Sequence, residues 1–102
     1  MTQLNHKIAI VTGAGGGFGE GIAAAYVQEG AKVIVADIQG AAAQRVASAL
    51  GANASPFTCD VTQKEQVQAL VKHCVDTYGL PDIVVNNAGT THKNRPMLEV
   101  DE

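Results

Sequence analysis

Short apolar runs alternate along the chain with longer segments in which apolar residues recur every three or four positions. The runs predict β-strands at residues 7–12, 32–37, 55–60 and 81–87. The first two runs are continuously apolar and rich in Val and Ile, which is typical of strands covered on both faces. The third run is weaker, and its Pro56 suits the start of a strand.

The segments between these runs have the 3.6-residue period of amphipathic helices. They predict helices from about residue 18 to 29, from 40 to 50, and between 62 and 79. In the last of these, apolar residues between Val67 and Tyr78 form one stripe. Thr62 and Glu65 have the spacing of a capping box at its start, and Gly79 marks its end.

Strands that alternate with helices predict a parallel sheet joined by right-handed crossovers. We therefore expect an α/β fold, a Rossmann-type doubly wound parallel sheet with strand order 3-2-1-4, truncated after the fourth strand. That order leaves the apolar strand at residues 83–85 on an open edge, where unpaired backbone favours aggregation. We accordingly expect a neighbouring strand to be missing, and an isolated chain of 102 residues to be marginally stable or prone to aggregate.

The composition is that of one small globular domain, with 46% hydrophobic residues, 17% charged residues and a net charge of -3. This mild acidity, with scattered Lys and Arg, argues against nucleic acid as a partner. The apolar runs are far shorter than the roughly 20 residues that cross a bilayer, so no membrane association is expected. The N-terminus lacks the apolar core of a signal peptide, which favours a cytoplasmic location.

The cysteines and histidines indicate structural roles rather than a metal site. Cys59 and Cys74 do not have the CxxC spacing, and a disulfide is possible on their number alone. We expect both to be buried free thiols, as is usual in a cytosolic chain. The three histidines are far apart and lack the spacing of metal ligands.

A glycine-rich loop joins the first predicted strand to the first predicted helix. It comprises Thr12, Gly13, Ala14, Gly15, Gly16, Gly17, Phe18 and Gly19, all of which except Ala14 are candidate cofactor-binding residues. Backbone N–H groups and the positive end of a helix dipole can bind a pyrophosphate at such a loop, and glycines let the phosphate approach the chain. A flexible turn without a ligand is the alternative. The common G-x-G-x-x-G spacing is absent, because Phe18 occupies the third glycine position.

The spacing that does fit is T-G-x-x-x-G-x-G, which resembles the cofactor loop of the short-chain dehydrogenase/reductase family. At the end of the fourth predicted strand, Asn86-Asn87-Ala88-Gly89 is similar to the N-N-A-G segment of that family. The resemblance is nearly continuous over residues 7–89. It implies that the Thr12 hydroxyl reaches this segment and that Asn87, Ala88 and Gly89 pass the inner ribose of the cofactor. An ordinary Asn-Gly turn is the alternative.

Asp37 ends the second predicted strand, 18 residues after Gly19. A carboxylate there can accept hydrogen bonds from the hydroxyls of the adenine ribose, and its charge would repel the 2′-phosphate of NADP. NADP-binding members of the family usually carry a basic residue where this chain has Gly16 or Ile38. We therefore predict NAD as the cofactor, with Asp37 and Ile38 in its site. A role for Asp37 as a simple turn cap is the alternative.

The resemblance extends to Asp60 and Val61, at the end of the third predicted strand. In the family, a carboxylate here accepts a hydrogen bond from the adenine amino group, and the backbone of the next residue meets a ring nitrogen. Asp60 could equally cap the following helix, and both interpretations stay open.

The activity implied by the resemblance is NAD-dependent hydride transfer between nicotinamide and an alcohol or ketone substrate. Residues 1–102 would be the N-terminal part of the NAD-binding domain of a homotetrameric parent. The catalytic Ser, Tyr and Lys of the family lie beyond the N-N-A-G segment, and Tyr26 and Tyr78 lack a Lys four residues later. We identify no catalytic residue, interpret both tyrosines as packing residues, and expect the chain alone to be inactive.

Two other functions remain as alternatives. One is a non-catalytic module that binds a dinucleotide. The other is an S-adenosylmethionine methyltransferase, which also combines a glycine loop with an acidic residue after the second strand. The T-G-x-x-x-G-x-G spacing and the N-N-A-G segment argue against the methyltransferase.

Overall fold

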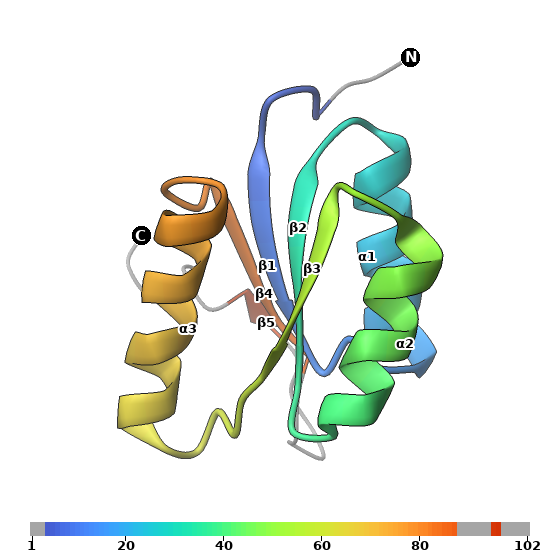
Figure 1. Cartoon of the computed structure of the whole chain (residues 1–102). Helices are drawn as coiled ribbons and strands as arrows, with labels where there is room; N and C mark the ends of the chain where they lie inside the picture. Colours follow the sequence, from blue (N-terminus) through green and yellow to red (C-terminus); the bar gives the residue numbers. More distant parts are fainter. Residues whose placement is uncertain (1–3, 88–94, 97–102) are drawn as a thin grey trace.

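The computed structural model describes residues 4–87 and 95–96, in which strands alternate with helices (Figure 1). The elements are β1 Ile8–Thr12, α1 Gly17–Gln28, β2 Lys32–Asp37, α2 Gly40–Leu50, β3 Ala54–Thr58, α3 Lys64–Thr77, β4 Ile83–Asn86 and β5 Arg95–Pro96. The predicted α/β architecture is confirmed. Within the described ranges, no helix combines the length and the apolar character that crossing a membrane requires.

The strands form one sheet in the order β3-β2-β1-β4-β5. The pairs β1–β2, β1–β4 and β2–β3 are parallel, so the predicted order 3-2-1-4 is confirmed. The predicted open edge at β4 is only partly open, because β5 pairs antiparallel with it and places Pro96 opposite Val85 and Arg95 opposite Asn86. A proline offers no N–H to a further strand, which suits an edge position. The marginal stability of the chain stays a prediction.

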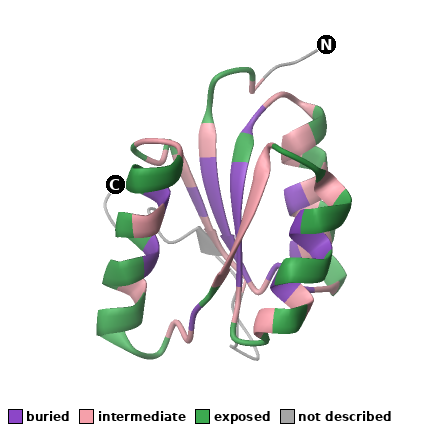
Figure 2. Cartoon of the chain, in the orientation of Figure 1, coloured by how far each residue is buried: buried purple, intermediate pink, exposed green. Residues whose placement is uncertain are grey.

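Helices cover both faces of the sheet, with α1 and α2 on one side and α3 on the other (Figure 1). Alternate residues of β1 and β2 enter opposite layers, and Figure 2 shows both strands as largely buried. The α1–α2 layer receives Ala9, Val11, Val33 and Val35, and the α3 layer receives Ile10 and Ile34. Burial on both faces explains why the sequences of β1 and β2 are continuously apolar rather than alternating.

The position of Pro56 differs from the prediction. β3 runs from Ala54 to Thr58, so the proline lies in the middle of the strand, opposite Val35, rather than at its start. The sheet tolerates it because β3 is at an edge of the sheet and has β2 on one side only. A proline in an edge strand can turn its missing N–H away from the ladder.

The predicted apolar stripe of α3 is only half buried. Leu70 and Cys74 pack into the core, whereas Val71 and Val75 are 38% and 41% exposed. Among the described residues, α3 is the helix on that face of the sheet, so its flank has no neighbouring helix (Figure 1). The prediction of buried free thiols is confirmed for Cys59 and Cys74, and burial raises the pKa of both.

Candidate functional site

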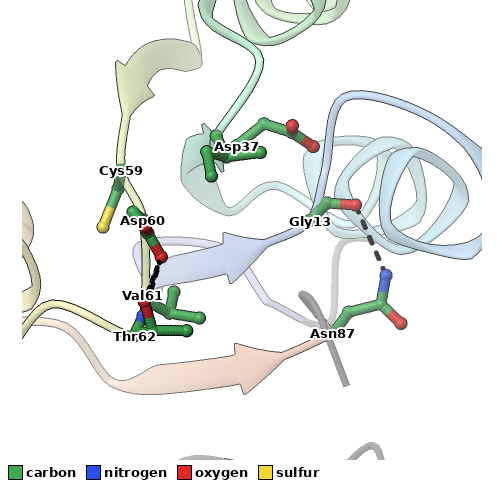
Figure 3. A pocket seen from close by; sticks show the side chains of 8 residues that line it. Gly13, Asp37, Cys59, Asp60, Val61, Thr62 and Asn87 are labelled. Carbon is green, nitrogen blue, oxygen red and sulfur yellow. Dashed lines mark hydrogen bonds between the residues drawn. The ribbon is translucent and has the colours of Figure 1, made fainter. Parts of the chain in front are cut away.

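The carboxyl ends of the parallel strands meet at one edge of the sheet, where a cavity of about 470 Å³ opens (Figure 3). It is lined by Gly13, Asp37, Ile38, Cys59, Asp60, Val61, Thr62 and Asn87. Open parallel sheets bind ligands at this place. The connection after β1 leads to β2 on one side of β1, the connection after β3 leads to β4 on its other side, and a crevice forms between the two halves. The sequence predicted all of these residues except Cys59 and Thr62. Those two residues flank the predicted pair Asp60 and Val61, and neither is part of a recognisable motif.

The glycine loop requires glycine at its three motif positions for two different reasons. Gly13 and Gly17 have φ angles of 63° and 58°, a left-handed conformation that side chains disfavour. Gly19 lies within α1, where a Cβ would collide with the carbonyl oxygen of Gly13 and come within 2.8 Å of Asn87 Nδ2. The spacing T-G-x-x-x-G-x-G therefore reflects the backbone geometry of this loop.

The N-terminus of α1 continues directly from the loop. Its N-cap is Gly16, which has no side chain to cap the helix, and a Cβ at Gly16 would meet no atom of the described residues within 4 Å. The first N–H groups of any α-helix lack partners within the helix, and together with the helix dipole they favour an anion. Phe18 lies in the first turn, is 83% exposed and is not among the residues that line the cavity.

Thr12 connects the loop to the N-N-A-G segment, as predicted. Its buried hydroxyl donates to Asn86 Oδ1 at 2.9 Å and accepts the backbone N–H of Asn87 at 3.0 Å. Asn87 Nδ2 in turn donates to the carbonyl oxygen of Gly13 at 3.4 Å (Figure 3). These bonds join the ends of β1 and β4 beneath the cavity. The other predicted residues of this segment, Ala88 and Gly89, lie outside the described residues.

We expect Thr12→Val to lower the free energy of unfolding by about 2 kcal/mol, because the part-buried N–H of Asn87 loses its acceptor. Thr12→Ser is the matched control. It keeps the hydroxyl and removes one methyl group, which costs about 0.8 kcal/mol when buried. Denaturation with urea measures both variants. A Thr12→Val chain as stable as the native chain would show that the bonds of the hydroxyl contribute nothing.

Asp37 ends β2 and uses both of its carboxylate oxygens. Oδ2 accepts the N–H of Gly15 at 2.8 Å, and Oδ1 accepts the N–H of Gln39 at 2.8 Å. The turn-capping alternative is therefore correct for one oxygen, while the other oxygen holds the glycine loop. Each carboxylate offers about four acceptor sites, so capacity for ribose hydroxyls remains. A Cβ at Gly15 would lie 2.9 Å from Asp37 Oδ2, which explains the glycine at this position.

Asp60 lies in a tight turn between β3 and α3. Its Oδ1 accepts the hydroxyl of Thr62 at 2.7 Å and the N–H of Thr62 at 3.0 Å, while its own N–H donates to Gln66 Oε1 at 2.8 Å. The predicted capping box of Thr62 and Glu65 is wrong, because this turn uses the hydroxyl and α3 begins at Lys64 without a side-chain cap. Within the described residues, Asp60 Oδ2 has no hydrogen-bond donor.

We expect Thr62→Val to raise the pKa of Asp60 toward its ordinary value. The Thr62 hydroxyl is the main cause of the lowered pKa, ahead of the Thr62 backbone N–H. Because the folded pKa lies below the unfolded one, these bonds stabilise the fold above the unfolded pKa, and the contribution is lost as the pH falls through the folded pKa. An NMR titration of the carboxyl carbon tests this, with Thr62→Ser as the control that keeps the hydroxyl. A pKa of Asp60 that is the same in all three proteins would contradict the expectation.

The two tyrosines are packing residues, as predicted, and the structure places them on opposite sides of the sheet. Tyr26 contacts the α1–α2 layer, and Tyr78 contacts the α3 layer, where its hydroxyl donates to the carbonyl oxygen of Ala52 at 3.3 Å. Burial raises the pKa of Tyr78. Neither residue lines the cavity.

Comparison with known proteins identifies the family of this chain. A sequence model of the short chain dehydrogenases matches residues 7–102. The chain belongs to the short chain dehydrogenase family. This membership excludes the methyltransferase alternative, which shares only the glycine loop and the acidic residue.

The relatives of this short chain dehydrogenase sequence include enzymes from plants and bacteria. It is 40% identical over 97 residues to secoisolariciresinol dehydrogenase of Forsythia intermedia, covering 94% of this chain and 35% of that protein. It is 48% identical over 86 residues to galactitol 2-dehydrogenase of Agrobacterium fabrum, covering 84% of this chain and 34% of that protein. The chain thus spans about a third of the length of these curated relatives.

Solved structures show the same fold. A 3-ketoacyl-(acyl-carrier-protein) reductase from Brucella melitensis, complexed with NADH, matches with a TM-score of 0.85 and 43% identity over 89% of this chain and 38% of that chain. A hydroxysteroid dehydrogenase from Escherichia coli matches with a TM-score of 0.83 and 40% identity over 86% of this chain and 38% of that chain.

Proposed function

We propose that this chain supplies the NAD-binding part of an oxidoreductase that transfers a hydride between nicotinamide and an alcohol or ketone. The observation that carries the proposal is Asp37, whose carboxylate lines the cavity and is hydrogen-bonded to the glycine loop. Membership of the short chain dehydrogenase family and the NADH complex of the similar Brucella reductase support a nicotinamide dinucleotide.

The cavity and the adjoining glycine loop, of which Gly13 lines the cavity, fit such a ligand. The N–H groups at the start of α1 would bind the pyrophosphate, next to a loop whose Gly19 leaves no space for a side chain. Asp37 would accept hydrogen bonds from the hydroxyls of the adenine ribose. Asp60 would accept a hydrogen bond from the adenine amino group through Oδ2. Ile38 and Val61 supply apolar surface to the same cavity. When bound, NAD would supply the hydride acceptor.

The same geometry favours NAD over NADP. A 2′-phosphate carries a charge of about -1.5 to -2 at neutral pH, so the Asp37 carboxylate would repel it at the ribose. Gly16 and Ile38 place no cation at the positions where NADP-binding members of the family usually have one. We therefore propose NAD as the natural cofactor.

The remainder of the proposed enzyme would lie outside this chain. Residues 1–102 would form the N-terminal part of the NAD-binding domain, and further sequence would supply the Ser, Tyr and Lys of catalysis, the site for a small alcohol or ketone, and the contacts of a cytoplasmic homotetramer. A non-catalytic dinucleotide-binding module is the second candidate. A Y-x-x-x-K sequence encoded in frame after Glu102 would favour the enzyme, and a stop codon there would favour the module.

Titration of the ¹⁵N-labelled chain with NADH tests the proposal. We expect amide shifts concentrated at the glycine loop, Asp37 and the turn at Asp60, together with a change in nicotinamide fluorescence. S-adenosylmethionine, which also contains adenosine, is the control and should cause weaker shifts. Shifts confined to other surfaces, or none at millimolar NADH, would refute the proposed function.

A further inference from the structure

Gly15 is a buried residue of the glycine loop whose peptide groups are held from both sides by charged side chains. Its N–H donates to Asp37 Oδ2 at 2.8 Å, and its carbonyl oxygen accepts from Arg45 Nη2 at 2.9 Å. Arg45 lies on α2. It belongs to no recognisable motif, so the sequence did not predict this contact. Gly15 is therefore bonded both to the Asp37 carboxylate and to the Arg45 guanidinium.

Arg45 is held on its other side by α1. Its Nη2 lies 3.6 Å from Glu20 Oε1, and the two side chains are 60% and 39% exposed. An ion pair this exposed is weak and screened by salt. The guanidinium has five N–H donors, and the contacts to Gly15 and Glu20 both involve the same nitrogen. Arg45 therefore keeps donors for an additional anion.

We propose that Arg45 is a cofactor-specificity residue, the cation that binds a 2′-phosphate at the adenine ribose once Asp37 no longer repels it. The inference rests on the proposed function, because it concerns the ribose end of the same site. Among the described residues, Arg45 is the basic side chain that contacts the glycine loop. Arginine binds phosphate with paired hydrogen bonds, which gives it more than a point charge at this position.

In the native chain the cation and the anion oppose each other. Asp37 repels a 2′-phosphate, while Arg45 is engaged by the Gly15 carbonyl and by Glu20. Discrimination between NAD and NADP is thus the balance of the two charged side chains that bond to Gly15. Removal of Asp37 alone should reveal the attraction, and removal of Glu20 in addition should strengthen it.

The test measures NADH and NADPH affinities of the Asp37→Ala chain with and without changes at Arg45. In the Asp37→Ala background, Arg45→Met should weaken NADPH binding about tenfold, the loss expected for one charge-assisted hydrogen bond, and leave NADH binding within about threefold. Arg45→Lys keeps the charge and should retain part of the NADPH affinity. Added salt should weaken NADPH binding more in the Asp37→Ala chain than in the double variant.

The outcomes separate this inference from the proposed function. Equal losses of NADH and NADPH affinity in the Asp37→Ala/Arg45→Met chain would show that Arg45 only supports the loop, and would overturn the specificity role. Unchanged NADPH affinity would also overturn it. Absence of NADH binding by the native chain would instead refute the proposed function, and with it the specificity role.

Discussion

Gly19→Ala is expected to lower the free energy of unfolding by about 3 kcal/mol and to abolish NADH binding. The added Cβ would collide with the carbonyl oxygen of Gly13 and crowd Asn87 Nδ2, so the loop must move away from α1. Both atoms belong to the ends of the central strands β1 and β4, which limits how far they can shift without breaking the sheet. Urea denaturation and NADH fluorescence measure the two effects.

Gly21→Ala is the matched control for this prediction. Gly21 lies on the same helix and is exposed, and no atom of the described residues beyond its own turn of helix lies within 4 Å of the place where its Cβ would be. Alanine should raise the free energy of unfolding by about 0.5–1 kcal/mol, because glycine is a poor residue for a helix interior. Equal responses at the two positions would contradict the close contact at Gly19. Intact NADH binding by a folded Gly19→Ala chain would contradict the placement of the pyrophosphate at this loop.

Asp37→Ala is expected to weaken NADH binding about 30-fold, within the range for loss of hydrogen bonds to a charged group. The variant also releases the N–H of Gly15, so part of the loss comes from a less ordered loop. NADPH binding should fall less or improve, because the repulsion of the 2′-phosphate disappears. The preference for NADH therefore collapses, and titration with both nucleotides measures it.

Asp76→Ala removes the same charge at a distance from the cavity and serves as the control. Asp76 forms an exposed ion pair with Lys72 on α3, so its loss should leave both nucleotide affinities unchanged. A similar collapse of preference in Asp76→Ala would show that net charge, rather than the ribose contact, sets the cofactor preference. Equal affinity of the native chain for NADH and NADPH would contradict the role of Asp37 directly.

Most of the fold was predictable because its signals are local and agree with one another. The bounds of β2 and α2 match the prediction, since an apolar run ends at a polar residue and the helix ends at Gly51, whose φ is 95°. The errors in the prediction occur where the same residue type is compatible with two different local structures. Pro56 can start a strand or lie in an edge strand, and the hydroxyl of Thr62 can cap a helix or bind Asp60.

The site divides in the same way. Backbone conformation and the ends of strands explain the residue types of the glycine loop, of Asp37 and of the Asp60 turn. Both features can be predicted from the order of residues in the sequence. Gln66 was missed because its bond to the N–H of Asp60 is local but has no recognisable motif spacing. Arg45 and Glu20 were missed because their contacts depend on how α1, α2 and the glycine loop pack together. A spacing of residues in one segment does not encode a contact between two helices.

The sequence by itself determined the alternation of strands and helices, the order of the parallel strands, and the positions where only glycine fits the loop. The alternation and the glycine positions depend on burial of the strands on two faces and on interactions between near neighbours in the chain. The strand order follows from the general topology of doubly wound sheets. The tertiary structure alone decided that Asp37 and Arg45 both bond to Gly15 and that β5 pairs with β4. Such contacts join side chains or strands through space, so their partners are known only once the elements have packed.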